Sequence, residues 1–214
     1  MNLKEQNYLT KLLKKYSKKS SSKKVRYALS PNSFSNKNII EGIKVLLSKR
    51  ITMGKITKRF EKEFAKFIGS KYALMVNSGS SANLLATFAM VNPMKKNRLK
   101  SGDECLIPSL CWSTSLWPII QAGLKPKFVD VDPETLNISL KDLEKKINKK
   151  TKAIVLVHVL GNSVNMKKLK RIINKYKIKL IEDACESLGS KFERKYLGSF
   201  GEFGTYSFYY SHQI

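Results

Sequence analysis

The sequence has few cysteines and no long apolar run, and these absences exclude several kinds of protein. Its three cysteines, Cys105, Cys111 and Cys185, are odd in number and show no CxxC spacing. That pattern argues against a disulfide framework or a zinc knuckle and is typical of reduced thiols in the cytosol. No stretch reaches the roughly 18 apolar residues that a membrane helix needs, and residues 1–19 lack the apolar core of a secretory signal. We therefore expect a cytoplasmic protein without membrane insertion.

Acidic residues are also scarce. The 214 residues include 16 acids against 41 lysines and arginines, which gives a formal net charge of +25. Such a charge is found in nucleic-acid-binding proteins, because lysine and arginine release counterions from phosphates. However, only six of the basic residues are arginine, the side chain best suited to bidentate phosphate and base contacts. We favour a lysine-rich surface with no nucleic-acid partner and keep a non-catalytic nucleic-acid-binding protein as the alternative.

The N-terminal segment differs in pattern from the rest of the chain. Residues 3–18 carry leucines and tyrosines at helical spacing with lysines opposite, and the run KKSSSKK (18–24) interrupts this pattern. We expect a basic N-terminal helix and linker over residues 1–28. Packing of this helix on its own chain or on a partner subunit is favoured over binding to a membrane surface.

Short apolar runs and helical patterns alternate after residue 38. Helices are expected over 38–47 and 56–68, the second ending at Gly69. Further helices are expected over 82–91, 114–121, 140–147 and 166–176, and strands over 72–76, 104–107, 127–131, 153–159, 179–182, 195–196 and 205–210. This alternation predicts an α/β fold with a mostly parallel sheet flanked by helices, in which ligands bind beyond the carboxyl ends of the strands.

The segment NSGSSAN (77–83) joins an apolar run to a helix through a short turn. The free N–H groups and the dipole at a helix N-terminus favour a phosphate, and Ser80 and Ser81 add hydroxyl groups. The segment lacks the Gly-Lys-Ser/Thr of a Walker loop and the GxGxxG fingerprint. The alternative is an ordinary helix cap made by Ser78 or Ser80.

Three other residues stand at informative places. Asp183 follows an apolar strand, where its carboxylate could pair with a protonated ring nitrogen; the alternative is a helix cap. Trp112 lies in the loop PSLCWSTS, where its ring could cover a flat cofactor; the alternative is core packing. His158 lies within an apolar run, which indicates a core histidine with satisfied hydrogen bonds.

Taken together, these segments resemble the DegT/DnrJ/EryC1/StrS family of sugar-nucleotide enzymes. The resemblance covers about residues 30–214, in family order. It implies the large domain of a fold-type I, pyridoxal-phosphate-dependent aminotransferase over 29–214, incomplete at the C-terminus. The segments that carry it are ITMGKITKRFEKEFAKFIGSKYALMVNSGSSANLL, RLKSGDECLIPSLCWSTS, KPKFVDVDPETLNIS, LVHVLGN and IEDACESLGSKFERKYLGSFGEFGTYSFYYSHQI.

The resemblance also implies roles for individual residues around pyridoxal 5'-phosphate or its pyridoxamine form. Trp112 is expected to stack on the ring, and Asp183 to pair with the ring nitrogen and maintain the electron sink. Glu186, where most members have glutamine, is expected near the 3-oxygen of the ring. The residues expected around the cofactor phosphate are Gly79, Ser80, Ser81 and Ser207.

One position departs from the family's aminotransferases. Their cofactor-binding lysine is replaced here by His212, which cannot form that covalent link but can move protons near neutral pH. The replacement resembles the sugar 3-dehydratases, which remove the C3 hydroxyl of GDP-4-keto-6-deoxymannose or CDP-4-keto-6-deoxyglucose in deoxysugar and O-antigen synthesis. Tyr210 and Ser211 favour the GDP-mannose kind, which takes its amino group from glutamate. A sugar aminotransferase, which requires the lysine, is the alternative.

The resemblance has a consequence for the whole protein. Family members continue well past the equivalent of residue 214, add a small C-terminal domain, and form dimers whose active site borrows residues from the partner. We therefore expect a homodimer at full length and no activity from the 214 residues alone. The cysteines of the iron–sulfur cluster that the CDP-glucose kind needs would also lie beyond residue 214.

Overall fold

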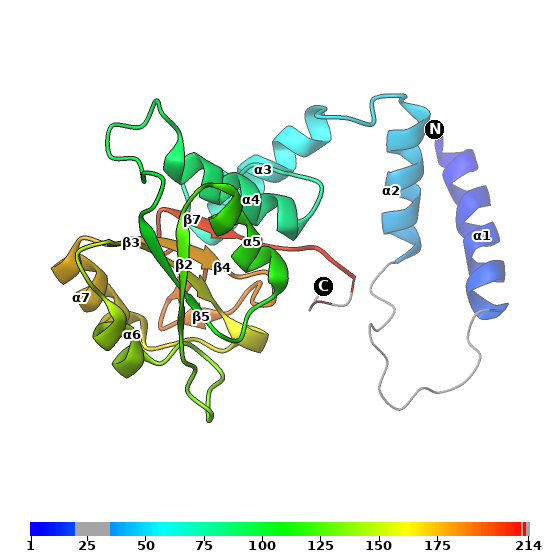
Figure 1. The fold of residues 1–214 in the computed structure, drawn as a ribbon. Coiled ribbons are helices and arrows are strands. Elements are labelled where there is room, and N and C mark those ends of the chain that lie inside the picture. The colour runs from blue at the N-terminus through cyan, green and yellow to red at the C-terminus, as the bar shows by residue number, and fades with distance from the viewer. Residues whose placement is uncertain (20–34, 211, 213–214) are drawn as a thin grey trace.

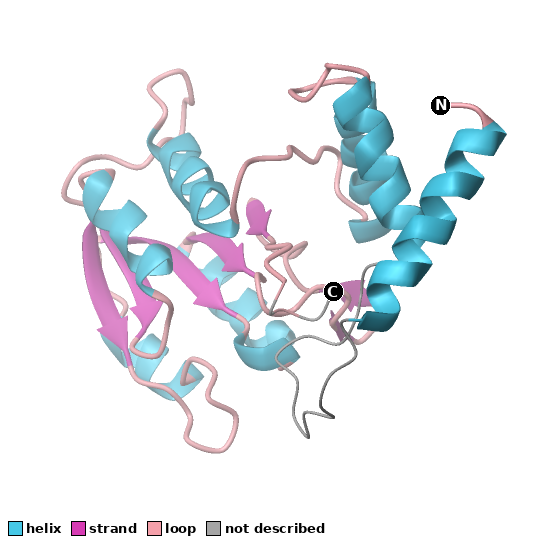
Figure 2. Ribbon diagram, turned by 90° about the vertical axis from the view of Figure 1, so that its right-hand side faces the viewer, coloured by secondary structure: helices cyan, strands magenta, loops and turns pink. Residues whose placement is uncertain are grey.

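The computed structural model describes residues 1–19, 35–210 and 212. A parallel sheet lies between two layers of helices, and a pair of helices stands to one side (Figures 1 and 2). The pair consists of α1 (Leu3–Lys19) and α2 (Asn36–Leu47), which pack against each other. Most of the expected linker and the boundary at residue 28 lie outside the described residues.

The main sheet has five strands in the order β2-β1-β3-β4-β7, all parallel to their neighbours. Its strands are β1 (Glu104–Pro108), β2 (Lys125–Val129), β3 (Thr151–Val157), β4 (Lys179–Asp183) and β7 (Phe203–Thr205). β5 (Lys191–Phe192) and β6 (Lys195–Tyr196) form a small antiparallel ribbon. The central strands are buried on both faces, which explains their continuous apolar runs. The expected α/β class is confirmed.

Helices cover both faces of this sheet. One face carries α4 (Gly79–Val91) and α5 (Ser113–Gln121), and the other α6 (Leu140–Lys146) and α7 (Met166–Tyr176). Successive residues of a strand point alternately toward the two helix layers. Val155 belongs to the hydrophobic cluster under α4 and α5, and Leu156 belongs to the one under α6 and α7. A 3-10 turn, η1 (Val159–Gly161), follows β3.

α3 (Lys55–Ile68) leads into the domain and ends at Gly69, whose φ of 79° is the left-handed cap expected from the sequence. Its aromatic face contacts the segment after β7. The ring of Phe64 meets that of Tyr206 edge-on at 5.2 Å, and the ring of Phe60 meets that of Phe208 at 5.4 Å. The aromatic stripe of α3 therefore anchors the residues that follow the sheet.

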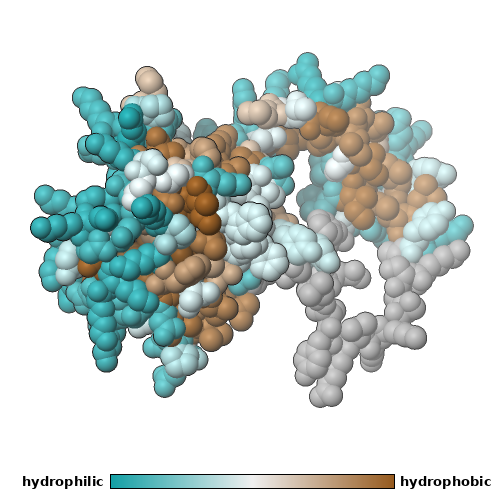
Figure 3. Space-filling model, viewed as in Figure 1, coloured by the Kyte–Doolittle hydropathy of each residue, from teal (hydrophilic) through white to brown (hydrophobic). Residues whose placement is uncertain are grey.

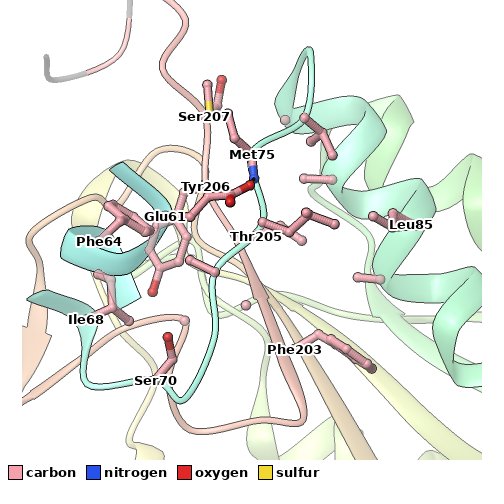
Figure 4. Close-up of a pocket in the computed structure, with 18 of the residues that line it drawn as sticks. Glu61, Phe64, Ile68, Ser70, Met75, Leu85, Phe203, Thr205, Tyr206 and Ser207 are labelled. Carbon is pink, nitrogen blue, oxygen red and sulfur yellow. Dashed lines mark hydrogen bonds between the residues drawn. The ribbon is translucent and has the colours of Figure 1, made fainter. Parts of the chain in front are cut away.

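The expected strand over 72–76 is wrong. This apolar run pairs with no strand among the described residues; instead the Met75 N–H donates to Glu61 Oε1 and the Tyr72 carbonyl accepts from Ser70 Oγ, both at 2.9 Å. Tyr72 is 77% exposed. A cavity of about 860 Å³ is lined by this run and by residues near β7, and Figure 4 shows both sides of it. A strand needs a backbone partner at about 5 Å, and the cavity occupies that place.

Other boundaries also differ, and β2 and β3 begin and end two residues earlier than expected. The last strand, expected over 205–210, is instead Phe203–Thr205, because its register with β4 ends where β4 ends, at the pair Asp183–Thr205. The helix expected from residue 82 begins at Gly79. No helix in the described part of the chain is long and apolar enough to cross a membrane. All three cysteines are free thiols, as expected.

Candidate functional site at the carboxyl end of β4

Asp183, the last residue of β4, forms the base of the candidate site. The residue is 5% exposed, and its Oδ2 accepts hydrogen bonds from Asn83 Nδ2 and Ser115 Oγ, both at 2.7 Å. Its Oδ1 accepts one from the backbone N–H of Cys185 at 3.1 Å. No helix begins here, so the alternative of a helix cap is wrong. α4, α5 and β4 thus hold one buried carboxylate in a fixed orientation.

The carboxylate of Asp183 affects the pKa of two cysteine thiols near it. Burial and then the negative charge of Asp183 raise the pKa of both Cys185 and Cys111. Both thiols therefore stay protonated at neutral pH and are poor nucleophiles. Among the described residues no lysine or arginine forms an ion pair with Asp183, so the carboxylate is held by neutral donors only.

The N-terminus of α4 lies beside this carboxylate. Ser78 caps the helix, since its Oγ accepts the N–H of Ser81 at 3.1 Å, which confirms the capping role for Ser78. Ser80 is exposed, and its hydroxyl donates to Thr114 Oγ1 at 3.1 Å. The first N–H groups of a helix have no partner within it and carry the positive end of its dipole. The geometry suits an anion.

Gly79 and Ser207 meet at this helix end. A Cβ on Gly79 would lie 2.8 Å from Cys185 Sγ and 2.9 Å from Ser207 Cβ, so only glycine fits without displacement. Ser207 is buried, and its Oγ accepts the N–H of Tyr209 at 3.2 Å. The segment after β7 therefore brings a serine hydroxyl to the start of α4, as Figure 4 shows for Ser207 at the top of the cavity.

Trp112 and Glu186 lie at the margins of this arrangement. Trp112 precedes α5 and is 73% exposed, so the alternative of core packing is wrong and the indole is available to a ligand. The helix it precedes supplies Ser115 to the carboxylate of Asp183. Glu186 is half-buried in the turn after β4, and its Oε2 accepts the backbone N–H of Leu160 at 3.3 Å.

His212 is the predicted residue that the structure ties least firmly to the others. Its backbone N–H donates to Tyr209 O at 2.9 Å, and its ring meets that of Tyr209 edge-on at 5.5 Å. Within the described residues no hydrogen bond joins the imidazole to another side chain. The structure thus brings together Gly79, Ser80, Ser81, Ser207 and Asp183, while the His212 ring has no hydrogen-bonding partner in the part of the chain that the structure describes.

Sequence reasoning missed the polar side chains that support Asp183. Asn83 and Ser115 are buried on the mainly apolar inner faces of α4 and α5. Thr205, at the end of β7, donates to Asn83 Oδ1 at 2.5 Å. A signal was present, because a buried polar residue within an apolar helix face needs a partner. The partner itself depends on the packing of three distant segments.

Comparisons with known proteins identify the family and its relatives. The family model described as "DegT/DnrJ/EryC1/StrS aminotransferase family" matches residues 34–214. A GDP-4-keto-6-deoxy-D-mannose 3-dehydratase of Escherichia coli O55:H7 is 49% identical over 170 residues, 79% of this chain and 44% of that protein. A GDP-perosamine synthase of Vibrio cholerae is 36% identical over 156 residues, 73% of this chain and 41% of that protein.

Two solved structures superpose closely on this chain. The E. coli GDP-4-keto-6-deoxy-D-mannose 3-dehydratase with bound hydrated PLP superposes with a TM-score of 0.84 at 46% identity, covering 88% of this chain and 48% of that one. A Helicobacter pylori aminotransferase of pseudaminic acid biosynthesis superposes with a TM-score of 0.79 at 28% identity, covering 88% and 49%. The chain spans about half the length of the curated relatives it matches.

Proposed function

The chain belongs to the DegT/DnrJ/EryC1/StrS aminotransferase family, and from this premise we propose that it binds pyridoxal 5'-phosphate or the pyridoxamine form at the carboxyl end of β4. The observation that carries the proposal is the pairing of a buried carboxylate, Asp183, with an anion-binding helix end at Gly79. A cofactor with a basic ring nitrogen and a phosphate needs both. The two features share neighbours, since Cys185 contacts both Gly79 and Asp183.

The phosphate end fits the residues present. The N–H groups at the start of α4 and the hydroxyls of Ser80, Ser81 and Ser207 are donors for phosphate oxygens. Gly79 leaves open the space that a Cβ would fill. No acidic side chain forms a hydrogen bond with these serines among the described residues, so no carboxylate competes with a phosphate for their hydroxyls.

The ring end fits as well. The carboxylate of Asp183 would hold a proton on the ring nitrogen, and Asn83 and Ser115 keep that carboxylate oriented. Trp112 would cover the ring, and Glu186 would lie near its 3-oxygen. When bound, the cofactor supplies an electron sink; the protein's part is to fix its orientation and its protonation.

The reaction we propose is loss of the C3 hydroxyl from a 4-keto-6-deoxy sugar nucleotide, with GDP-4-keto-6-deoxymannose as substrate, in deoxysugar and O-antigen synthesis. The dehydratase relatives and the histidine at position 212 support it. Glutamate would donate the amino group and leave as 2-oxoglutarate, and ammonia would be released. The oxygen lost by the sugar equals the oxygen gained in making 2-oxoglutarate. His212 would transfer the proton that the loss of the C3 hydroxyl requires.

A homodimer and a cytoplasmic location belong to the same proposal. Large apolar side chains stay exposed on the outer faces of α4 and α5, and Figure 3 shows brown, apolar surface where α5 lies. Exposed apolar faces of this kind mark interfaces. The residues are Leu84, Phe88, Trp117 and Ile120.

The test uses the whole protein with GDP-4-keto-6-deoxymannose, glutamate and pyridoxal 5'-phosphate. We expect ammonia, 2-oxoglutarate and a sugar nucleotide lacking one oxygen, measured by coupled assay and mass spectrometry. The His212→Asn variant should bind cofactor but lose most turnover, because proton transfer by a positioned side chain contributes roughly 100- to 10,000-fold. An amino sugar formed without ammonia would instead identify an aminotransferase, and absence of cofactor binding would refute the site.

A further inference from the structure

Glu182 is a buried carboxylate that the proposed chemistry does not use. It precedes Asp183 on β4, so its side chain points to the opposite face of the sheet. Its exposed fraction is 0%, and no lysine or arginine forms an ion pair with it among the described residues. Three of its hydrogen bonds come from backbone N–H groups between β6 and β7, at 2.9, 2.5 and 2.6 Å from Gly198, Phe200 and Gly201.

His158 supplies the fourth hydrogen bond. Its Nε2 lies 3.0 Å from Glu182 Oε2, and since a carboxylate only accepts, Nε2 carries the hydrogen. The ring is fully buried, and Nδ1 has no partner in the described part of the chain. The backbone on both sides is fixed: the His158 N–H donates to Asp183 O at 3.0 Å, and the His158 carbonyl accepts from Ser187 Oγ at 2.8 Å. The imidazole therefore donates its hydrogen bond to Glu182 from a fixed position.

The loop held by Glu182 lies flat against β4. A Cβ on Gly201 would collide with the carbonyl oxygen of Leu180, and one on Gly204 with that of Gly198. From this loop the chain enters β7, where Glu182 pairs with Gly204 in the register of the sheet. Three residues after Gly204, Ser207 abuts the start of α4.

We propose that Glu182 is a positioning residue: its carboxylate fixes the loop 198–201, this loop sets the register of β7, and the register holds Ser207 at the N-terminus of α4. His158 orients the carboxylate from the other side. The effect on a phosphate rests on the proposed function, whereas the effect on the loop does not. The two adjacent acids of β4 then have different roles: Asp183 faces the cofactor, and Glu182 fixes the backbone that positions the phosphate site.

The test is the Glu182→Gln variant of the whole protein. Oε1 accepts from Phe200 and Gly201, and Oε2 from His158 and Gly198, so a glutamine NH₂ group would face two donors whichever way it turned. An unsatisfied buried group costs enough to shift an equilibrium by about tenfold or more. We expect amide hydrogen exchange of residues 198–201 to accelerate by about tenfold or more. The ratio of the Kd of pyridoxal to that of pyridoxal 5'-phosphate should fall by a similar factor.

Two control comparisons separate positioning from general damage. Glu202→Gln alters the carboxylate that directly follows this loop and bonds to two lysines rather than to backbone, and it should leave exchange at 198–201 and the Kd ratio unchanged. His158→Gln places an amide N–H near the position of Nε2 and should preserve both, whereas His158→Leu should reproduce the defect of Glu182→Gln.

The outcomes are separable. Unchanged exchange at 198–201 in Glu182→Gln would overturn the inference, and so would faster exchange with an unchanged preference for the phosphorylated ligand. If the unmodified protein shows no preference for pyridoxal 5'-phosphate over pyridoxal, the proposed function fails, and hydrogen exchange alone then decides whether Glu182 positions the loop.

Discussion

Replacing Gly79 with alanine tests the close packing at the start of α4. Gly79 does not have a positive φ, so the backbone accepts alanine, and in a helix alanine is normally favoured over glycine by roughly 0.5–1 kcal/mol. Here the new Cβ would lie 2.8 Å from Cys185 Sγ and 2.9 Å from Ser207 Cβ. Overpacking of this kind costs about 1–3 kcal/mol. We therefore expect a net loss of roughly 1–2 kcal/mol in the free energy of unfolding.

Gly42→Ala is the matched control. Gly42 lies within α2, and a Cβ there would meet no atom within 4 Å, so this variant should gain roughly 0.5–1 kcal/mol. Urea unfolding followed by circular dichroism measures both changes. The double variant Gly79→Ala/Cys185→Ala also removes the sulfur. Its loss in the free energy of unfolding should be smaller than the sum of the losses in the two single variants, because the two side chains share one contact. Equal stabilisation by Gly79→Ala and Gly42→Ala would refute the packing argument.

Three further predictions concern charge and exposure. Asp183→Asn should weaken binding of pyridoxal 5'-phosphate by about tenfold or more, and because the charge of Asp183 raises the pKa of Cys111, the variant should lower that pKa and speed alkylation of Cys111 by iodoacetamide. Trp112→Ala should change stability by less than about 0.5 kcal/mol, since the side chain is 73% exposed, yet weaken cofactor binding in a fluorescence titration. Burial alone would raise the pKa of Glu202, but two lysines lower it, so Glu202→Gln should cost less than about 1 kcal/mol at pH 7. That difference should shrink in acid unfolding curves as the pH falls below the ordinary glutamate pKa of 4.5 and through the lowered pKa of Glu202.

The order of elements could be predicted because periodicity reflects burial. α7 and β3 occupy nearly the expected residues, since a helical stripe and a continuous apolar run each fit one environment in this fold. The run 72–76 has the same apolar character as β3, yet forms no strand. Hydrophobicity specifies that a segment needs cover, but it does not specify a hydrogen-bonding partner.

The helix start at Gly79 was missed for a local reason. The residues Gly79 to Ser81 have turn-forming composition, and glycine and serine are weak helix formers. The cap made by Ser78 and the packing of Gly79 against Ser207 outweigh that preference. The contact joins residues far apart in the sequence, so the pattern around 77–83 alone could not reveal it.

The two acids at the end of β4 show what a sequence pattern can and cannot distinguish. Both are buried, and an isolated buried carboxylate is costly unless it is hydrogen-bonded. The pleat sends Asp183 toward Asn83 and Ser115, which are side chains, and Glu182 toward backbone N–H groups and His158. Asp183 is therefore oriented by side chains of two helices, whereas Glu182 is enclosed by a loop and a histidine. The alternation of the strand alone gives these two adjacent acids different surroundings.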